Sequence, residues 1–435
     1  MSPAWSQLLA SAQIGRKYGW AVLAPASALV LAVIQNAVAS RVLGPAGFGP
    51  FAVSVAILTL VGVAIGFGMP VSLVRFSTRL RPGDVDARAS YHAVAWGVVF
   101  LGAALVGTVL TGLELTAGDR LRVWTPAHAA PAIIVGGFGI ALTEMAAAEA
   151  QVLLDFRRYF FTVAAAALLR LVGIGCGLWL GGPSLLAALY GYAFGSLSAS
   201  LLLAGPNIVG SARRLAKREW ELAPLFQELA HFALPIVGST FIVAAIGYVD
   251  TLLIAPVLGA SDVGVYAAGV RLTTIQSTML AGITTLALPL AGRAVSERWM
   301  GSFAKRVFLL GGALGVCVTI SLVLLSTLLV RGVYGPLYSA SAPLFAVLSI
   351  GLLINFVGNP LSQLAYAVGA PRILFVGHVC QLVALAVGLP LVASSYHLMG
   401  VAVFRSVVNI AVVSAIIVAT VARIALGNQP AVEGA

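Results

Sequence analysis

The chain has 435 residues, of which 60% are hydrophobic and only 9% are charged, with a formal net charge of +11. A soluble domain carries roughly 25% charged residues, so this composition excludes a water-soluble globular fold. The excess of basic residues would by itself fit a nucleic-acid partner, but these residues lie between apolar segments, where membrane topology accounts for them without nucleic acid.

Long apolar segments follow one another along the chain. A bilayer core needs about 20 apolar residues per helix, and a spanning segment must be a helix or part of a closed barrel. The apolar residues do not alternate with period two, which disfavours a barrel. The pattern predicts an all-α integral membrane protein of about twelve transmembrane helices, near residues 20–40, 51–75, 91–111, 130–150, 160–181, 184–204, 231–257, 265–289, 307–330, 341–368, 373–394 and 398–422. The longest apolar runs are expected to break at Gly44-Pro45, Gly181-Gly182-Pro183, Gly335-Pro336 and near Ser394-Ser395.

The 25 Lys and Arg residues predict the orientation. With the N-terminus inside, 18 of them fall in inside segments and four in outside segments, while Arg170, Arg271 and Arg405 lie within helices. Cytoplasmic segments of membrane proteins are enriched in Lys and Arg. The distribution therefore predicts an even number of helices with both termini in the cytoplasm, beside anionic lipids of the inner leaflet.

An internal repeat relates two parts of the chain. Residues 42–52 (VLGPAGFGPFA) align without gaps to residues 257–267 (VLGASDVGVYA), with five identities in eleven positions. Both segments are predicted outside turns after the first helix of a half, which favours two related six-helix lobes inserted the same way up. The expected organisation is an interfacial segment at 1–19, an N-terminal lobe at 20–204, a basic cytoplasmic linker at 205–228, a C-terminal lobe at 229–426 and a tail at 427–435.

Several short motifs resemble one family of membrane proteins. Residues 41–49 (RVLGPAGFG), 66–70 (GFGMP) and 74–76 (VRF) are similar to the start of the polysaccharide biosynthesis flippases. Residues 233–235 (ALP), 249–250 (VD), 263–266 (VGVY) and 289–290 (PL) resemble the opening of that family's second half. The family includes the O-antigen flippases and belongs to the multidrug/oligosaccharidyl-lipid/polysaccharide exporter superfamily.

The resemblance implies a function. It implies a carrier in the bacterial inner membrane that moves an undecaprenyl-diphosphate-linked oligosaccharide from the cytoplasmic to the periplasmic leaflet by alternating access, without a cofactor. The expected partners are membrane lipids, the lipid-linked glycan, a coupling ion (H+ or Na+) and glycan-assembly enzymes. Two alternatives remain: a small-molecule or drug exporter on the same scaffold, and a polytopic glycan polymerase.

Ionisable residues inside a membrane are costly and usually functional or paired. Asp250, Arg271 and Arg405 lie at comparable depths below the outer ends of their predicted helices. One carboxylate against two guanidinium groups could bind a diphosphate, since Arg offers bidentate donors to phosphate oxygens. Asp250 is also a candidate for binding the coupling ion. The alternative is a structural Asp250–Arg271 pair, with Arg405 reaching the interface.

Three further charged residues are candidates in the N-terminal half. Glu144 and Arg170 lie near the membrane midplane of adjacent predicted helices, where a structural ion pair is expected. Arg75 matches the Arg that follows the second helix in the family that the chain resembles, where it would attract a diphosphate from the inner leaflet. The alternative for Arg75 is a simple topological anchor.

Uncharged polar residues on two predicted helices are candidate glycan contacts, because amides and hydroxyls both donate and accept hydrogen bonds. They are Thr274 and Gln276 on the helix near 265–289, and Asn355, Asn359 and Gln363 at four-residue spacing near 341–368. Four-residue spacing places three side chains on one face of a helix. The alternative is hydrogen bonding between packed helices.

Enzymatic readings find little support. His92, His128, His231, His378 and His397 are scattered, without the spacing of a metal site or a catalytic motif. Cys176, Cys317 and Cys380 lie inside apolar segments and predict neither a disulfide framework nor a metal site. We therefore predict no catalytic residue and no metal ligand.

Overall fold

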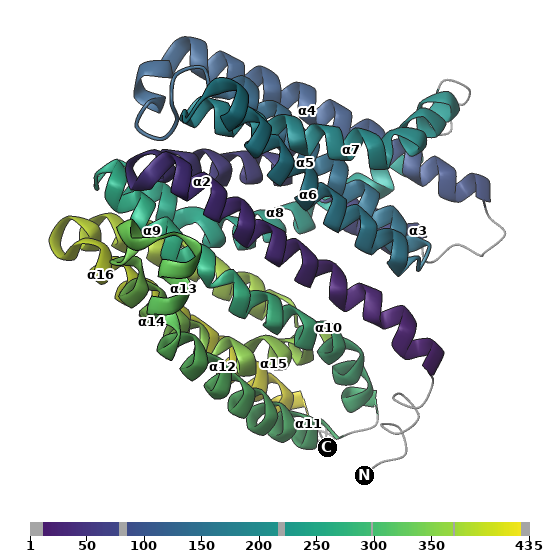
Figure 1. Ribbon diagram of the computed structural model, residues 1–435. Helices are drawn as coiled ribbons and strands as arrows, with labels where there is room; N and C mark the ends of the chain where they lie inside the picture. Colours follow the sequence, from purple (N-terminus) through teal and green to yellow (C-terminus); the bar gives the residue numbers. More distant parts are fainter. Residues whose placement is uncertain (1–11, 78–84, 216–221, 297–298, 369, 428–435) are drawn as a thin grey trace, which may run out of the picture. The chain divides into compact units, whose positions relative to one another are not determined.

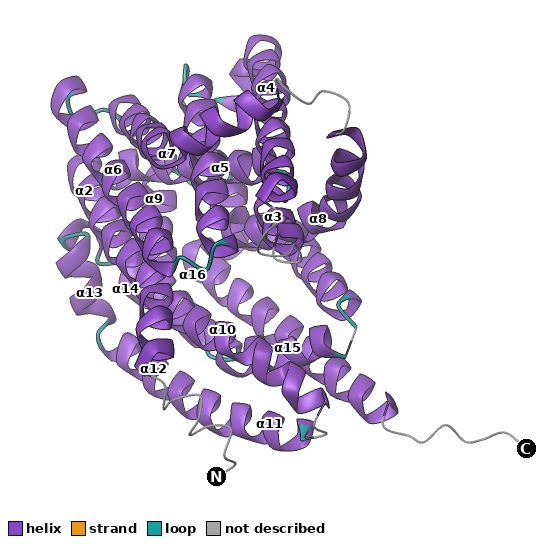
Figure 2. Ribbon diagram, turned by 90° about the vertical axis from the view of Figure 1, so that its right-hand side faces the viewer, coloured by secondary structure: helices purple, strands orange, loops and turns teal. Residues whose placement is uncertain are grey.

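The computed structural model describes residues 12–77, 85–215, 222–296, 299–368 and 370–427. These residues form helices joined by short turns, and no strand occurs among them (Figure 2). The predicted all-helical fold class is therefore confirmed. The proposed interfacial segment at 1–19 and the tail at 427–435 fall largely outside the described residues, because residues 1–11 and 428–435 are not described.

Nine helical stretches of the described chain are long and apolar enough to cross a membrane. Two of them exceed 50 residues and each contains a sharp break, at Gly44 and at His397. The twelve predicted ranges fall almost entirely on helical residues, but the number of crossings stays a prediction. The length and apolar character of these helices make the chain a multi-pass membrane protein.

The first compact unit covers Met1–Ala244. Its elements in chain order are α2 (Ala12–Gly66), α3 (Met69–Ser77), α4 (Val85–Leu121), α5 (Ala130–Val152), α6 (Phe156–Gly181), α7 (Leu185–Leu215) and the first two thirds of α8 (Leu222–Ile254) (Figure 1). Helix α7 packs on α5 and α6, and α2 packs on the same two helices.

Glycines bring the backbones of α6 and α7 together. A Cβ atom on Gly173 would lie 2.2 Å from the carbonyl oxygen of Gly191, and one on Gly177 would lie 2.2 Å from that of Ala187. Small residues allow such close approach between helices in membranes, where no hydrophobic force drives their association. The backbones of these two helices are therefore closely packed in the first unit.

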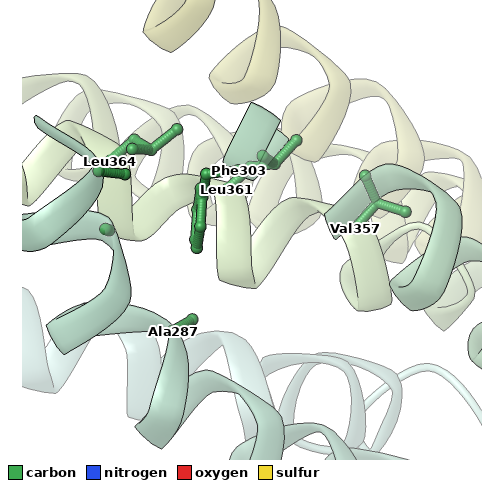
Figure 3. Packing of buried hydrophobic residues seen from close by; sticks show 7 residues of the cluster. Ala287, Phe303, Val357, Leu361 and Leu364 are labelled. Atoms are coloured by element: carbon green, nitrogen blue, oxygen red, sulfur yellow. The ribbon is translucent and has the colours of Figure 1, made fainter. Parts of the chain in front are cut away.

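The second compact unit covers Ala245–Ala435. It contains the end of α8 followed by α9 (Ala260–Leu272), α10 (Thr274–Ser296), α11 (Met300–Arg306), a π-helical turn at Val307–Gly311, α12 (Gly312–Leu324), α13 (Ser326–Val333), a 3-10 turn at Pro336–Tyr338, α14 (Ser341–Leu352), α15 (Asn355–Ala367) and α16 (Arg372–Gly427). Helix α10 packs on α15, and α16 packs on α14 and α15. Buried side chains of α10, α11 and α15 form a cluster that includes Ala287, Phe303, Val357, Leu361 and Leu364 (Figure 3).

The division between the units falls within α8, between Ala244 and Ala245. The predicted linker at 205–228 is largely helical where it is described, because α7 extends to Leu215 and α8 begins at Leu222. The two copies of the sequence repeat both lie where one helix gives way to the next. Gly44 has a φ of 64° at the break in α2, and Gly259 is the residue before α9. The relation between two six-helix lobes stays a prediction.

Candidate substrate site

The buried carboxylate of Asp250 is the centre of a polar cluster in the second unit. Asp250 is fully buried near the end of α8, and its Oδ2 forms an ion pair with Arg405 of α16. The hydroxyl of Tyr266 on α9 donates to the same oxygen at 2.8 Å. The backbone N–H of Thr251 donates to Oδ1 at 2.8 Å. These partners compensate the buried charge and tie three helices together.

Arg271 lies apart from this ion pair. It is half-buried in the last turn of α9, and its guanidinium lies 5.0 Å from the centre of the Tyr248 ring, in cation–π geometry. Tyr334, which follows α13, is within electrostatic range. No carboxylate in the described chain forms an ion pair with Arg271. The pairing is thus Asp250 with Arg405, and not the Asp250–Arg271 pair that the sequence left as an alternative.

The charges of this region therefore separate into a neutral pair and a single cation. Asp250 and Arg405 cancel one another, and Arg271 keeps its charge beside an aromatic face. The guanidinium group is weakly hydrated, can stack on an aromatic ring and still has planar donors to offer to an oxyanion. Of the three predicted residues, Arg271 is the one whose donors an anionic group could use.

The polar residues of α10 mostly contact the protein itself. Gln276 is buried, and its Nε2 donates to Thr319 Oγ1 at 3.1 Å and to the carbonyl oxygen of Ser349 at 3.2 Å. Thr274 donates its hydroxyl to the carbonyl oxygen of Arg271, one turn earlier. The contacts of Gln276 join α10 to α12 and α14, as expected for interhelical hydrogen bonding in a membrane.

The amide side chains of α15 also form hydrogen bonds within the protein, some to another helix and some within α15. Asn355 accepts a hydrogen bond at 3.1 Å from Asn409 on α16, which also donates to the carbonyl oxygen of Gly351 and accepts from Gln381. Gln363 donates to the carbonyl oxygen of Asn359, within the same helix. Asn409 and Gln381 were not among the residues predicted from the sequence. Single amides in otherwise apolar helices are the signal that could have identified them.

In the first unit, Glu144 and Arg170 do not form a direct ion pair. Arg170 donates from Nε to the carbonyl oxygen of Ala166, and its guanidinium lies 5.9 Å from the centre of the Tyr192 ring. Glu144 is exposed on α5 and interacts with Arg170 only at longer electrostatic range. The guanidinium of Arg170 thus contacts the Tyr192 ring of α7 and not the carboxylate of Glu144. Arg75 is exposed in the last turn of α3.

A second buried carboxylate, Glu149 at the end of α5, was not among the predicted sites. It is 2% exposed and accepts a 2.8 Å hydrogen bond from Trp96 Nε1 of α4. The same carboxylate oxygen, Oε1 of Glu149, also lies 3.1 Å from Nδ1 of His92, which is on α4. The available signal was one lone histidine and one lone glutamate at the same end of two consecutive predicted helices.

The fold of the chain is similar to that of several solved membrane transporters. A multidrug resistance MATE family transporter of the MOP superfamily, in an inward-facing conformation, aligns with a TM-score of 0.70 over 92% of this chain and 95% of its own, at 14% identity. The lipid II flippase MurJ, in an inward closed conformation, gives 0.68 over 94% and 92%, at 11% identity. A Vibrio cholerae MATE transporter gives 0.61 over 95% and 96%, at 16% identity. The chain therefore has the fold of the MOP superfamily transporters.

The sequence then assigns the chain to a family. The profile of the family described as "Polysaccharide biosynthesis protein" matches residues 14–295, and no curated protein sequence matches significantly. The chain belongs to the polysaccharide biosynthesis protein family, which confirms the resemblance inferred from its motifs. Family and fold together support a membrane flippase or exporter, and the structural neighbours are transporters and flippases, not enzymes.

Proposed function

We propose that the chain is a flippase that moves an undecaprenyl-diphosphate-linked oligosaccharide from the cytoplasmic to the periplasmic leaflet of a bacterial inner membrane by alternating access, with both of its termini in the cytoplasm. The family supports a polysaccharide precursor as cargo, and the fold is shared with a lipid II flippase. The single observation that carries the proposal is that Arg271 lies against the Tyr248 ring and forms no ion pair with a described carboxylate.

Arg271 suits a diphosphate because its charge is neither cancelled nor fully hydrated. Asp250 and Arg405 neutralise one another, so Arg271 is the uncompensated positive charge among the three. The Tyr248 ring fixes the guanidinium by cation–π contact, which leaves its N–H donors for an oxyanion. Arg pairs with phosphate in a bidentate manner, with both geometric and electrostatic selectivity.

Arg75 supports an entry route from the inner leaflet. It is exposed at the end of α3, in a segment that the charge distribution predicts to be cytoplasmic. A basic side chain at that level attracts an anionic headgroup over about a Debye length. Arg75 would thus raise the rate of substrate entry, and Arg271 would bind the diphosphate during transport.

The test is transport of a labelled lipid-linked oligosaccharide in reconstituted vesicles. We expect Arg271→Ala to slow transport about tenfold, the equivalent of one charge-assisted hydrogen bond. Arg271→Lys should recover only part of the rate, because Lys keeps the charge without the planar donors. Arg331→Ala, which removes an exposed Arg from the last turn of α13, is the matched control. Full transport by Arg271→Ala at normal expression would contradict this role.

A second candidate function is export of a cationic small molecule. The observation that favours it is Glu144, an exposed carboxylate on a membrane-spanning helix without a direct ion-pair partner. A cationic substrate would use such a carboxylate, whereas an anionic one would be repelled by it. If this candidate is right, vesicles will accumulate a lipophilic cationic dye, Glu144→Gln will abolish the accumulation, and Arg271→Ala will not.

A further inference from the structure

Glu149 and His92 form a buried acid–imidazole pair in the first unit that the proposed substrate site does not use. The pair joins α5 to α4, with 3.1 Å between Glu149 Oε1 and His92 Nδ1. Trp96 Nε1 donates to the same oxygen at 2.8 Å. In a neutral imidazole, the nitrogen that faces a carboxylate carries the proton, so Nδ1–H is the donor to Glu149.

The other ring nitrogen of His92 has no partner. Its Nε2 is buried and makes no hydrogen bond, although the side chain as a whole is 17% exposed. With the proton on Nδ1, this nitrogen carries only a lone pair. A buried, unpaired lone pair next to a carboxylate is an acceptor for a proton, because the resulting imidazolium is stabilised by the negative charge already in contact with the ring.

We propose that His92 and Glu149 bind the coupling proton of the transport cycle, with the proton arriving on Nε2 of His92. The neutral ring takes one proton and becomes an imidazolium, Glu149 stays ionised, and no other bond is formed or broken. What the bound proton drives rests on the proposed transport function, whereas proton binding itself does not depend on it.

The chemistry of the pair selects a proton over a metal ion or Na+. Hard cations need several oxygen ligands that point at the site. Here the carboxylate of Glu149 is contacted by the N–H groups of Trp96 and His92, which would repel a cation. No group of three or more His, Cys, Asp or Glu side chains that could hold a metal ion occurs in the part of the chain that the structure describes.

Other ionisable groups lie on α4 itself and on helices that contact α4 or α5. They lie on α3, α4, α6 and α8, the last of these through a 2.7 Å hydrogen bond from Tyr91 to Glu228. These groups are Arg75, Arg88, Tyr91, Tyr159 and Glu228. Arg213 and Arg214 lie towards the end of α7, but their side chains are outside the described residues.

The bound proton changes what the α4–α5 contact requires. An imidazolium has two N–H donors, and in the present packing Nε2–H would be buried without an acceptor. A conformation that supplies an acceptor or water to Nε2 is therefore favoured once the proton is bound. Proton binding thereby shifts the population between two arrangements of these helices, as a coupling ion must.

The first experiment measures proton binding directly, by 15N NMR of the imidazole groups in the full chain reconstituted in nanodiscs. The chain has five histidines, so His92→Gln assigns the His92 signals by their loss. We expect the His92 signals to show uptake of a proton on Nε2 as the pH is lowered. Glu149→Gln, which keeps an oxygen acceptor but no charge, should move the change to lower pH. A His92 ring that stays neutral down to pH 5, or titrates identically in Glu149→Gln, would overturn the proposal.

The second experiment measures coupling, with the labelled lipid-linked oligosaccharide in vesicles that carry a pH gradient. A gradient of one pH unit corresponds to about a tenfold bias for one proton, so the wild-type rate should depend on it. His92→Gln should transport at a rate that the gradient does not change, and His378→Gln, a histidine of α16, should behave as wild type. If the transport rate still depends on the pH gradient in both His92→Gln and Glu149→Gln, the proposal is wrong. If wild type moves no oligosaccharide, the proposed function fails, and the NMR titration alone decides whether the proton site exists.

Discussion

Among the described residues, each of the two units has one buried carboxylate, and the two carboxylates are stabilised in different ways. Asp250 in the second unit is paired with Arg405, which stays charged at any physiological pH. Glu149 in the first unit is held by Trp96 and by His92, whose charge can change. The difference separates a permanent structural cross-link from a contact that can respond to protons.

Breaking the Asp250–Arg405 pair should have the largest effect. Arg405→Ala leaves a fully buried carboxylate without its cation, which typically costs about 3–5 kcal/mol. Thermal unfolding in detergent measures the loss. The double variant Asp250→Asn/Arg405→Ala should recover part of it, because the uncompensated charge is gone. Equal destabilisation of the single and double variants would show that packing, and not charge, makes Arg405 important.

The contact of Glu149 with Trp96 should come next. Trp96→Phe removes a donor to a buried carboxylate and also leaves a small void, for a combined cost of about 2–4 kcal/mol. Trp179→Phe is the matched control, because Trp179 is 82% exposed and its loss should change stability by less than about 0.5 kcal/mol. If Trp96→Phe is as mild as the control, Glu149 does not depend on this hydrogen bond.

Three of the expected helix breaks occur where glycine precedes proline, although Gly49-Pro50 and Gly205-Pro206 lie within continuous helix. Gly44, Gly182 and Gly335 each adopt a positive φ at an expected break, a conformation that glycine adopts without strain, and proline follows each of them. The break expected near Ser394-Ser395 lies at His397, with a φ of 50°, between the predicted helices at 373–394 and 398–422. No glycine or proline marks His397 itself, so the sequence indicates the region of this break and not its exact residue.

The sequence predicted how deep in the membrane the charged residues of the candidate site lie, but it did not predict which of them form pairs. Position along a helix gives depth, which is why Asp250 and Arg405 could be expected at one level. Which side chain takes a carboxylate depends on how each helix is rotated about its axis, and no single-sequence pattern specified that rotation. The same reason explains why Glu144 was expected beside Arg170, whereas the guanidinium lies over Tyr192.

Of the three changes to stability, removal of the Tyr266 hydroxyl should be the smallest. It is also the most direct test of the difference between Asp250 and Glu149. Tyr266→Phe keeps the buried ring and deletes only the donor to Asp250, which retains Arg405 and the N–H of Thr251. A hydrogen bond to a charged group contributes about 1.5–3 kcal/mol, and the remaining partners should keep the measured loss near the lower end. Tyr248→Phe, which deletes a hydroxyl but keeps the ring beside Arg271, is the matched control and should be nearly neutral. Thermal unfolding of both variants at pH 5 and pH 8 should give the same difference, since neither Arg405 nor a buried tyrosine changes charge in that range. A pH-dependent cost would mean that Asp250 itself takes up protons, and the distinction between a fixed and a responsive carboxylate would be lost.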